Sequence, residues 1–565
     1  MQFRPAVQRL LPFLVWLPHM NRDTLRADAI AGISVALVAI PQSLAYAQLA
    51  GLPAYYGLYA ALIPTLVGAL FGSSAQLSTG PVALTSLLTA ASIAPLAASG
   101  SGQYIACAIV LAMLSGIFQI GFGVLRLGVL MNLLSHPVLM GFVNAAAILI
   151  TLSQVPSLLG IAPASTGHAL GDAWQFLWRL DQAHGHSLAF GISAIAMLVA
   201  FRRFAPALPG VLFAVVILTA LSQYLGYAGH GGRVVGEVPR GLPGIALPAA
   251  EWVAWVALLP AAFVIAVISF MEAMSSAKIA SIKTATTWDE NQELIGQGLA
   301  KVAAALSQTM PVSGSFSRSA LNLAANARTG MSSMICALCV LLTVLYFTPL
   351  LEHLPHPVLA AIIIMALTNL INLRSLRNAW RASADDAVAA VLTFCATLAF
   401  APQIQNGIFA GVLVSLSLFI YRRMRPRVEV AEPGSENLLR DLPAEIPQAL
   451  RGAIGVVRFD ASLVFVNASY FEAAVLGLEA AHPALRFVLV SAHSINRLDA
   501  SGVEMLSSLG DGLGKKGIAL VFSGVNTQVY EVLDRTGLAT RIGAENFFPD
   551  DQSAFVALAG RAAVR

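Results

Sequence analysis

Residues 77–83 read LSTGPVA and lie between two apolar runs, so a Gly-Pro pair falls where a membrane helix is expected to begin. A second stretch, SGSFSRSALN at 313–322, is equally poor in large apolar side chains and carries an arginine inside a hydrophobic region. Non-helical backbone at membrane depth is tolerated only where protein groups or a water-filled cavity satisfy its polar groups. The two stretches therefore indicate interrupted membrane helices.

The amino-acid composition indicates a membrane protein rather than a soluble one. Of the 565 residues, 57% are hydrophobic and 11% are charged, whereas soluble domains carry about 25% charged residues. The chain is predicted to be an integral membrane protein. Segments long enough to cross ~30 Å of hydrocarbon number fourteen, at 28–50, 55–71, 81–98, 103–125, 136–159, 188–204, 208–225, 256–277, 291–306, 315–327, 331–351, 357–373, 384–400 and 404–421.

Charged loop residues predict the orientation. With a cytoplasmic N-terminus, most lysines and arginines between spans fall inside, and the opposite loops hold only Arg233, Arg240 and, as a further candidate, Lys301. This asymmetry follows the positive-inside rule. We expect a multi-pass protein of the inner (plasma) membrane with both termini cytoplasmic. The net charge of +4 then reflects topology, and no nucleic-acid partner is expected.

Four regions follow from these patterns: a cytoplasmic segment at 1–27, a transmembrane domain at 28–427, a polar linker at 428–450 and a soluble domain at 451–565. In the last region, helical patterns alternate with short buried strands. The predicted strands are AIGVVRF, LVFVN, RFVLVS and IALVFSG. A small cytoplasmic α/β domain with a mostly parallel or mixed sheet is expected.

The transmembrane domain shows internal symmetry. IPQSLAYAQLA at 40–50 aligns with FMEAMSSAKIA at 270–280, which pairs Gln42 with Glu272. In both halves the small-residue break falls at the third span. Because seven spans are an odd number, two such repeats must be inverted, with a binding site at their interface.

The first break is built to expose backbone donors. Gly80 lets the chain turn, Pro81 suits the first helical position, and Val82 and Ala83 follow with free N–H groups. A helix N-terminus carries a partial positive charge, and an anion satisfies its unpaired N–H groups.

The second break repeats this pattern. Gly314 supplies the flexible position, and Ser315, Phe316 and Ser317 open the helix. Arg318 lies one turn further, and an arginine inside a membrane segment is a functional candidate because burying it alone is unfavourable. The alternative is that its side chain extends to the cytoplasmic interface.

Glu272 is an acid deep in the eighth span, with Ser276 one turn further on the same face. We interpret this pair as a site for a proton or Na⁺ that crosses with the substrate; the alternative is a structural ion pair between Glu272 and Arg318. Asn144, Asn322 and Gln42 are expected to form hydrogen bonds between helices, although Gln42 lies beside the predicted site.

The sequence resembles a known family in three places. Residues 32–84, GISVALVAIPQSLAYAQLAGLPAYYGLYAALIPTLVGALFGSSAQLSTGPVAL, resemble the opening signature of the sulfate permease (SulP) family, and PVSGSFSRSALN at 311–322 resembles its tenth-span motif. INRLDASGVEML at 495–506 resembles the STAS domain, the sulfate transporter and anti-sigma antagonist module.

The resemblance implies two inverted seven-span repeats divided into a core and a gate, elevator-like anion transport and a homodimer. Glu272 and Ser276 occupy the positions of the coupling-ion residues. Together with the reasoning above, it gives a substrate-binding set of Gln42, Tyr46, Val82, Ala83, Ser315, Phe316, Ser317 and Arg318.

The STAS resemblance aligns Ser501 with the serine that is phosphorylated in stand-alone anti-sigma antagonists. Where an acidic residue is expected near the end of a strand, this chain has Ser491 and His493. We therefore interpret Ser501 as a helix N-terminal residue, while a cytoplasmic partner at the STAS domain remains a hypothesis.

The leading hypothesis is a secondary transporter of a small oxyanion, sulfate, coupled to protons through Glu272. The alternatives are a bicarbonate or dicarboxylate transporter that uses Na⁺ or anion exchange, an anion channel, and a membrane-tethered STAS signalling protein. A nucleobase symporter fits less well, because Arg318 favours an anion. No nucleophile and base set, P-loop or metal cluster is recognisable, so no enzyme activity, cofactor or metal is expected.

Overall fold

The computed structural model describes residues 11–128, 136–161, 171, 175, 179–205, 208–239, 241–368, 371–401, 403–431 and 452–563. The chain divides into two compact units, Met1–Ser415 and Leu416–Arg565. Most of the segment predicted to be a linker, from 432 to 450, lies outside the described residues.

Within the described residues, a helix or a short run of helices lies in each of the fourteen predicted spans. The first half follows the short helices α2 (Phe13–Trp16) and η1 (Leu17–His19). Its elements are α3 (Arg22–Leu49), α4 (Tyr55–Ala60) with α5 (Ile63–Phe71), β1 (Thr79–Gly80) with α6 (Ala83–Ile93), α7 (Gly102–Val124), α8 (His136–Leu159), η3 (Leu180–Gln182), α10 (Gly185–Phe204), α11 (Gly210–Tyr224) and η4 (Tyr227–His230).

The second half repeats this order and adds a short basic helix, α18, between its fifth and sixth spans. Its elements are α12 (Trp252–Thr284), α13 (Glu290–Leu306), β2 (Ser313–Gly314) with α14 (Phe316–Ala324), α15 (Met331–Leu342) continuing through η5 (Thr343–Phe347) into α16 (Thr348–Leu351), α17 (His356–Leu367), α18 (Leu373–Ala382), α19 (Ala384–Ala399) and α20 (Gln405–Met424).

Seven helices among the described residues are long and apolar enough to cross a membrane by themselves. Interrupted spans supply shorter apolar helices, such as α6 and α17. Lys301 lies inside the predicted span 291–306, so it does not belong with the loop charges Arg233 and Arg240. It lies within α13 and is fully buried.

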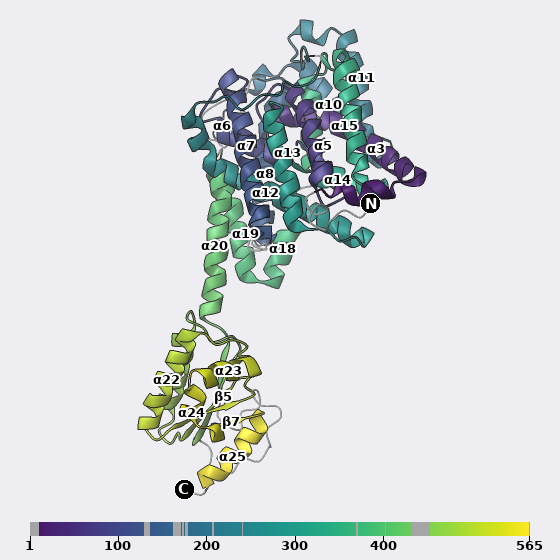
Figure 1. Ribbon diagram of the computed structural model, residues 1–565. Helices are drawn as coiled ribbons and strands as arrows, with labels where there is room; N and C mark the ends of the chain where they lie inside the picture. The colour runs from purple at the N-terminus through teal and green to yellow at the C-terminus, as the bar shows by residue number, and fades with distance from the viewer. Residues whose placement is uncertain are drawn as a thin grey trace. The chain divides into compact units, whose positions relative to one another are not determined.

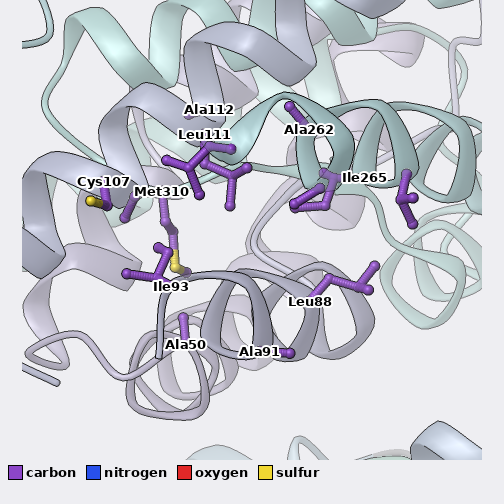
Figure 2. Packing of buried hydrophobic residues seen from close by; sticks show 14 of the residues in the cluster. Ala50, Leu88, Ala91, Ile93, Cys107, Leu111, Ala112, Ala262, Ile265 and Met310 are labelled. Atoms are coloured by element: carbon purple, nitrogen blue, oxygen red, sulfur yellow. The ribbon is translucent and has the colours of Figure 1, made fainter. Parts of the chain in front are cut away.

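Apolar side chains from both halves form one core. Helices α7, α12 and α13 pack against one another (Figure 1). Leu88 and Ile93 of α6 face Leu111 of α7 and Ile265 of α12, and Met310 lies among them (Figure 2). The third span of the first half is thus held against α12, the first span of the second half.

The second unit is a five-stranded sheet in the order β3-β4-β5-β6-β7. Its strands are β3 (Val428–Ala431), β4 (Ile454–Phe459), β5 (Phe487–Ser491), β6 (Ala519–Ser523) and β7 (Phe547–Phe548). β3 pairs antiparallel with β4 and the others are parallel, as the predicted mixed sheet requires. Residues 428–431, expected to begin the linker, therefore belong to this sheet.

Alternate residues of each strand face opposite layers of helices (Figure 1). One layer contains α21 (Ala468–Ala481), α22 (Ala500–Lys515), α23 (Thr527–Arg535) and α24 (Leu538–Ile542), and the other is α25 (Asp551–Ala563); η7 (Ala544–Asn546) precedes β7. Val488 and Val490 face the first layer, while Leu489 faces Phe555 and Leu558 on α25.

One predicted strand, LVFVN at 463–467, is wrong. Leu463 forms an isolated bridge with Leu498, and Asn467 Oδ1 accepts a hydrogen bond from Val464 N at 3.0 Å. This side-chain bond closes a turn and competes with strand pairing. Leu463 is buried although it lies outside a named strand, so the apolar residues of this segment did not by themselves indicate a strand.

The carboxylate that the sequence lacks near the end of β5 comes from another element. Asp551, the first residue of α25, accepts hydrogen bonds from Ser491 and Ser523, and His493 Nε2 lies 3.6 Å from it. Ser501 is exposed in the first turn of α22, where Asp499 caps the helix by accepting from Gly502 N at 2.9 Å. This position fits its interpretation as a helix N-terminal residue.

The contact between α3 and α4 depends on Gly57. A Cβ atom at this position would lie 1.8 Å from the backbone oxygen of Ser43. We expect Gly57→Ala to separate these helices and to lower the stability of the protein by about 1–3 kcal/mol or more, as overpacked cores do. Thermal unfolding of the purified protein in detergent measures this.

Gly121→Ala on α7 is the matched control, because a Cβ there meets nothing within 4 Å. It should leave the melting temperature unchanged or raise it slightly, since alanine favours the helix. Equal melting temperatures for the two variants would contradict the proposed contact.

Candidate functional site

The two sequence breaks pair with each other. β1 and β2 form a two-stranded antiparallel sheet with Thr79 opposite Gly314 and Gly80 opposite Ser313. Ser315 N donates to Ser78 O at 2.8 Å. Each break therefore satisfies the other's backbone polar groups, which hydrocarbon could not do.

Both half-helices start from this small sheet. α6 begins at Ala83, and Val82 in the N-cap position provides no side-chain acceptor. α14 begins at Phe316, where Ser315 Oγ accepts from Arg318 N at 3.4 Å. The first N–H groups of α6 thus keep the unpaired donors and the partial positive charge that attract an anion.

Arg318 lies between the breaks. Its side chain is buried, and Nη1 donates to Pro81 O at 2.8 Å while Nε is 3.4 Å from Ser78 Oγ. The alternative that this side chain extends to the interface is therefore wrong. Within the described residues Nη2 has no hydrogen-bond partner, and it lies where a Cβ on Gly80 would approach within 2.9 Å. Glycine at 80 thus leaves room for the guanidinium, and a buried donor remains for a ligand.

The other residues of the predicted substrate-binding set differ in exposure. Tyr46, Val82, Ala83, Gln42 and Ser315 are buried, whereas Phe316 and Ser317 are exposed. Tyr46 is close enough to Arg318 and Glu272 to interact electrostatically with both. The structure thus brings Tyr46 and the two breaks to one place.

Of the predicted substrate-binding set, Gln42 lines a cavity of about 400 Å³. Gln42 of α3 and Leu321 of α14 line one side, and residues of α10, α11 and α17 line the other, including Arg202. In the part of the chain that the structure describes, Gln42 Oε1 has no hydrogen-bond partner. Gln42 thus lines an opening between α3 and α14 on one side and α10, α11 and α17 on the other, while its side-chain oxygen is buried.

Glu272 contacts a residue that the sequence analysis did not select. Ser313 Oγ donates to Ser269 O at 3.0 Å and lies 3.4 Å from Glu272 Oε2. Ser276 Oγ instead donates to the backbone oxygen of Glu272 at 3.0 Å. Among the described residues Glu272 and Arg318 form no ion pair, so the structural-pair alternative does not hold in this conformation. Ser313 is the first residue of the SGSFSRSALN stretch, so its position in the second break could have marked it as a site residue.

Further polar side chains form hydrogen bonds with the first break and with the residues just before it. Thr65 Oγ1 donates to Thr79 O and Gln297 Nε2 donates to Thr79 Oγ1, both at 2.8 Å. Asn322 Nδ2 donates to Gln76 O at 3.1 Å, and Asn144 Oδ1 accepts from Asn372 N at 2.7 Å. Asn322 Nδ2 also donates to Ser332 Oγ on α15 at 3.0 Å, which is a predicted bond between helices. The partner of Asn144 lies just before α18, and Gln42 Oε1 has no partner among the described residues.

Two buried carboxylates fix the adjoining loops. Asp28 of α3 accepts from Arg328 N at 2.6 Å and from Thr329 N at 3.1 Å. Glu293 of α13 accepts from the backbone N–H groups of Ser73 and Ser74 at 2.8 and 2.9 Å. Backbone donors compensate both charges, as buried carboxylates require.

The combined geometry is suited to a small anion. Two helix N-termini, a buried guanidinium with a free donor and the Tyr46 ring come from segments more than 200 residues apart in the chain. The Glu272 carboxylate lies near the same sheet.

Two family models match this chain. The Sulfate permease family model covers residues 25–393 and the STAS domain model covers 446–554. Among curated proteins, a probable sulfate transporter 4.2 of Arabidopsis thaliana is 32% identical over 97% of this chain and 83% of its own length. A probable sulfate transporter of Mycobacterium tuberculosis is 31% identical over 95% of this chain and 96% of its own.

Solved structures have the same fold. The murine solute carrier 26 family member A9, an anion transporter solved in an inward-facing state, matches 99% of this chain and 95% of its own with a TM-score of 0.89 at 21% identity. The transmembrane domain of a cyanobacterial bicarbonate transporter matches 70% of this chain and 98% of its own with a TM-score of 0.60 at 25% identity. The chain therefore belongs to the sulfate permease family, as a multi-pass membrane anion transporter whose fourteen spans form two inverted repeats and whose C-terminal part is a STAS domain.

Proposed function

We propose that the protein carries sulfate across the membrane by proton symport. The observation that carries this proposal is the pairing of β1 with β2, which brings the N-termini of α6 and α14 to the free Nη2 of Arg318. Relatives about 30% identical along nearly the whole chain are named sulfate transporters, which supports sulfate as the anion.

In this mechanism the anion accepts hydrogen bonds from the backbone at Val82, Ala83, Phe316 and Ser317. Arg318 Nη2 donates to it, and Gln42 and Tyr46 line its entry. Glu272 takes up the proton, because a neutral carboxyl repels the arriving anion less than a carboxylate does. Proton binding and anion binding then favour each other, which is the coupling that symport requires.

Transport also needs access from both sides. The cavity between the α3 and α14 side and the α10, α11 and α17 side supports an elevator-like movement of the first group past the second. We also propose that both termini lie in the cytoplasm, that the protein forms a homodimer and that its STAS domain binds a cytoplasmic partner.

Bicarbonate transport coupled to Na⁺ is the second candidate, because the transmembrane domain is similar to that of a bicarbonate transporter. The same site geometry would accept either oxyanion. The coupling ion distinguishes the two candidates, since Na⁺ needs the ionised form of Glu272 whereas a proton neutralises it.

We expect purified protein in proteoliposomes to accumulate radiolabelled sulfate under an inward proton gradient and not under a sodium gradient alone. Glu272→Gln should lose the dependence on the proton gradient, because glutamine cannot bind the proton. Initial rates with proton, sodium and null gradients measure this.

Glu251→Gln is the matched control, because Glu251 precedes the same helix and is exposed. It should transport as the native chain does. Sodium-driven uptake of labelled bicarbonate without sulfate uptake would favour the second candidate, and a Glu272→Gln variant that still responds to the proton gradient would remove Glu272 from the coupling mechanism.

A second prediction concerns Arg318. Arg318→Lys keeps the charge but cannot reach Pro81 O, Ser78 Oγ and the anion together, because lysine lacks the guanidinium fork. We expect the KM for sulfate to rise roughly tenfold, about the loss of one charge-assisted hydrogen bond. Concentration-dependent uptake measures this.

Arg328→Lys provides the comparison, since the Arg328 side chain is exposed and only its backbone N–H is bound by Asp28. Its KM should match that of the native chain. Equal KM values for the native chain and Arg318→Lys would argue against direct contact between Arg318 and the anion.

A further inference from the structure

Lys301 is a buried charge to which the proposed mechanism gives no role. It lies in α13 with its side chain fully buried, and Nζ donates to Gln119 Oε1 on α7 at 2.7 Å. A lysine within a membrane segment is unfavourable unless it serves a partner or a substrate. One neutral amide does not compensate an ammonium group.

The packing of α7 against α13 fixes this contact. A Cβ on Gly116 would lie 2.8 Å from Gly298 O, and a Cβ on Gly298 would lie 2.8 Å from Gly116 O. The two backbones therefore touch, one turn from both Gln119 and Lys301. Close backbone approach at small residues is the usual basis of helix pairing in membranes, and here it holds the ammonium group at a defined place.

A chain of polar groups leads from Lys301 to Glu272. Gln119 Nε2 donates to Ala266 O at 3.0 Å and to Ser269 Oγ at 3.2 Å. Ser313, which donates to Ser269 O, lies 3.4 Å from the Glu272 carboxylate. The chain runs through α7, α12 and β2, so it ends at the small sheet from which both half-helices start.

Positive side chains outnumber negative ones near the site. The polar chain connects Lys301 to Glu272. Arg318 lies at the same small sheet, where its Nη1 donates to Pro81 O. With Glu272 ionised, two cations and one carboxylate leave one net positive charge. With Glu272 protonated and Lys301 charged, the group carries two, which balances a dianion. Without Lys301 the protonated group would carry only one, which balances a monovalent anion.

We infer that Lys301 makes the site select a divalent over a monovalent oxyanion, by adding a second positive charge behind Glu272 without touching the substrate. This inference rests on the proposed transport of sulfate. Lys301 and Gln119 are fully buried, so water screens the lysine charge less than it screens a surface charge.

The test compares sulfate with nitrate, a monovalent oxyanion, in proteoliposomes under an inward proton gradient. For Lys301→Met we expect the KM for sulfate to rise at least roughly tenfold, while the concentration of nitrate that halves sulfate uptake changes by less than about threefold. Lys301→Arg, which keeps the charge, should restore much of the preference for sulfate. Lys283→Met removes an exposed lysine at the end of α12 and should change neither value.

The ratio of the two constants separates a charge effect from a structural one. If Lys301→Met weakens sulfate and nitrate equally, or if it changes only the melting temperature, the inference is overturned and Lys301 is structural. If the native chain takes up sulfate and Lys301→Met keeps the native ratio, the inference alone fails. If the native chain takes up no sulfate, the proposed function fails first, and with it the divalent preference.

Discussion

The pairing of Thr79 and Gly80 with Ser313 and Gly314 is the interaction on which the site depends. Backbone that leaves a helix inside a membrane must find partners within the protein, and here each break is the partner of the other. Gly314 can take this position because its Cα packs against Ala273 on α12, where a Cβ would approach within 2.9 Å. The same helix carries Glu272, so the sheet and the carboxylate are fixed together.

The buried and half-buried charges of the transmembrane unit fall into two groups. Asp28 and Glu293 are compensated by backbone N–H groups and hold loops. Arg318, Glu272 and Lys301 have incomplete local compensation, and they gather around the small sheet. A buried charge without full compensation is unfavourable by itself, so the second group is where we propose that the anion and the coupling ion bind.

Features that depend on neighbouring residues could be predicted from the sequence, whereas contacts between residues far apart in the chain could not. Hydrophobic length predicted the fourteen spans, and the positions of Gly80, Pro81 and Gly314 predicted where α6 and α14 begin, because helix ends depend on nearby residues. Local pattern failed for 463–467, where the side chain of Asn467 closes a turn. It also failed for Lys301, whose charge suggested a loop although its partner lies on a helix far along the chain.

The sequence alone determined that the chain crosses the membrane many times, that two of its helices are interrupted and that a soluble α/β domain follows. Only the tertiary structure decided that Ser313 rather than Ser276 reaches the Glu272 carboxylate, that Arg318 contacts Pro81 and that Lys301 joins the same polar group. The physical reason is how far apart in the chain the interacting residues lie. Apolar length and helix-end chemistry are properties of neighbouring residues, whereas the partner of a buried polar side chain is set by helices that meet across both halves of the fold.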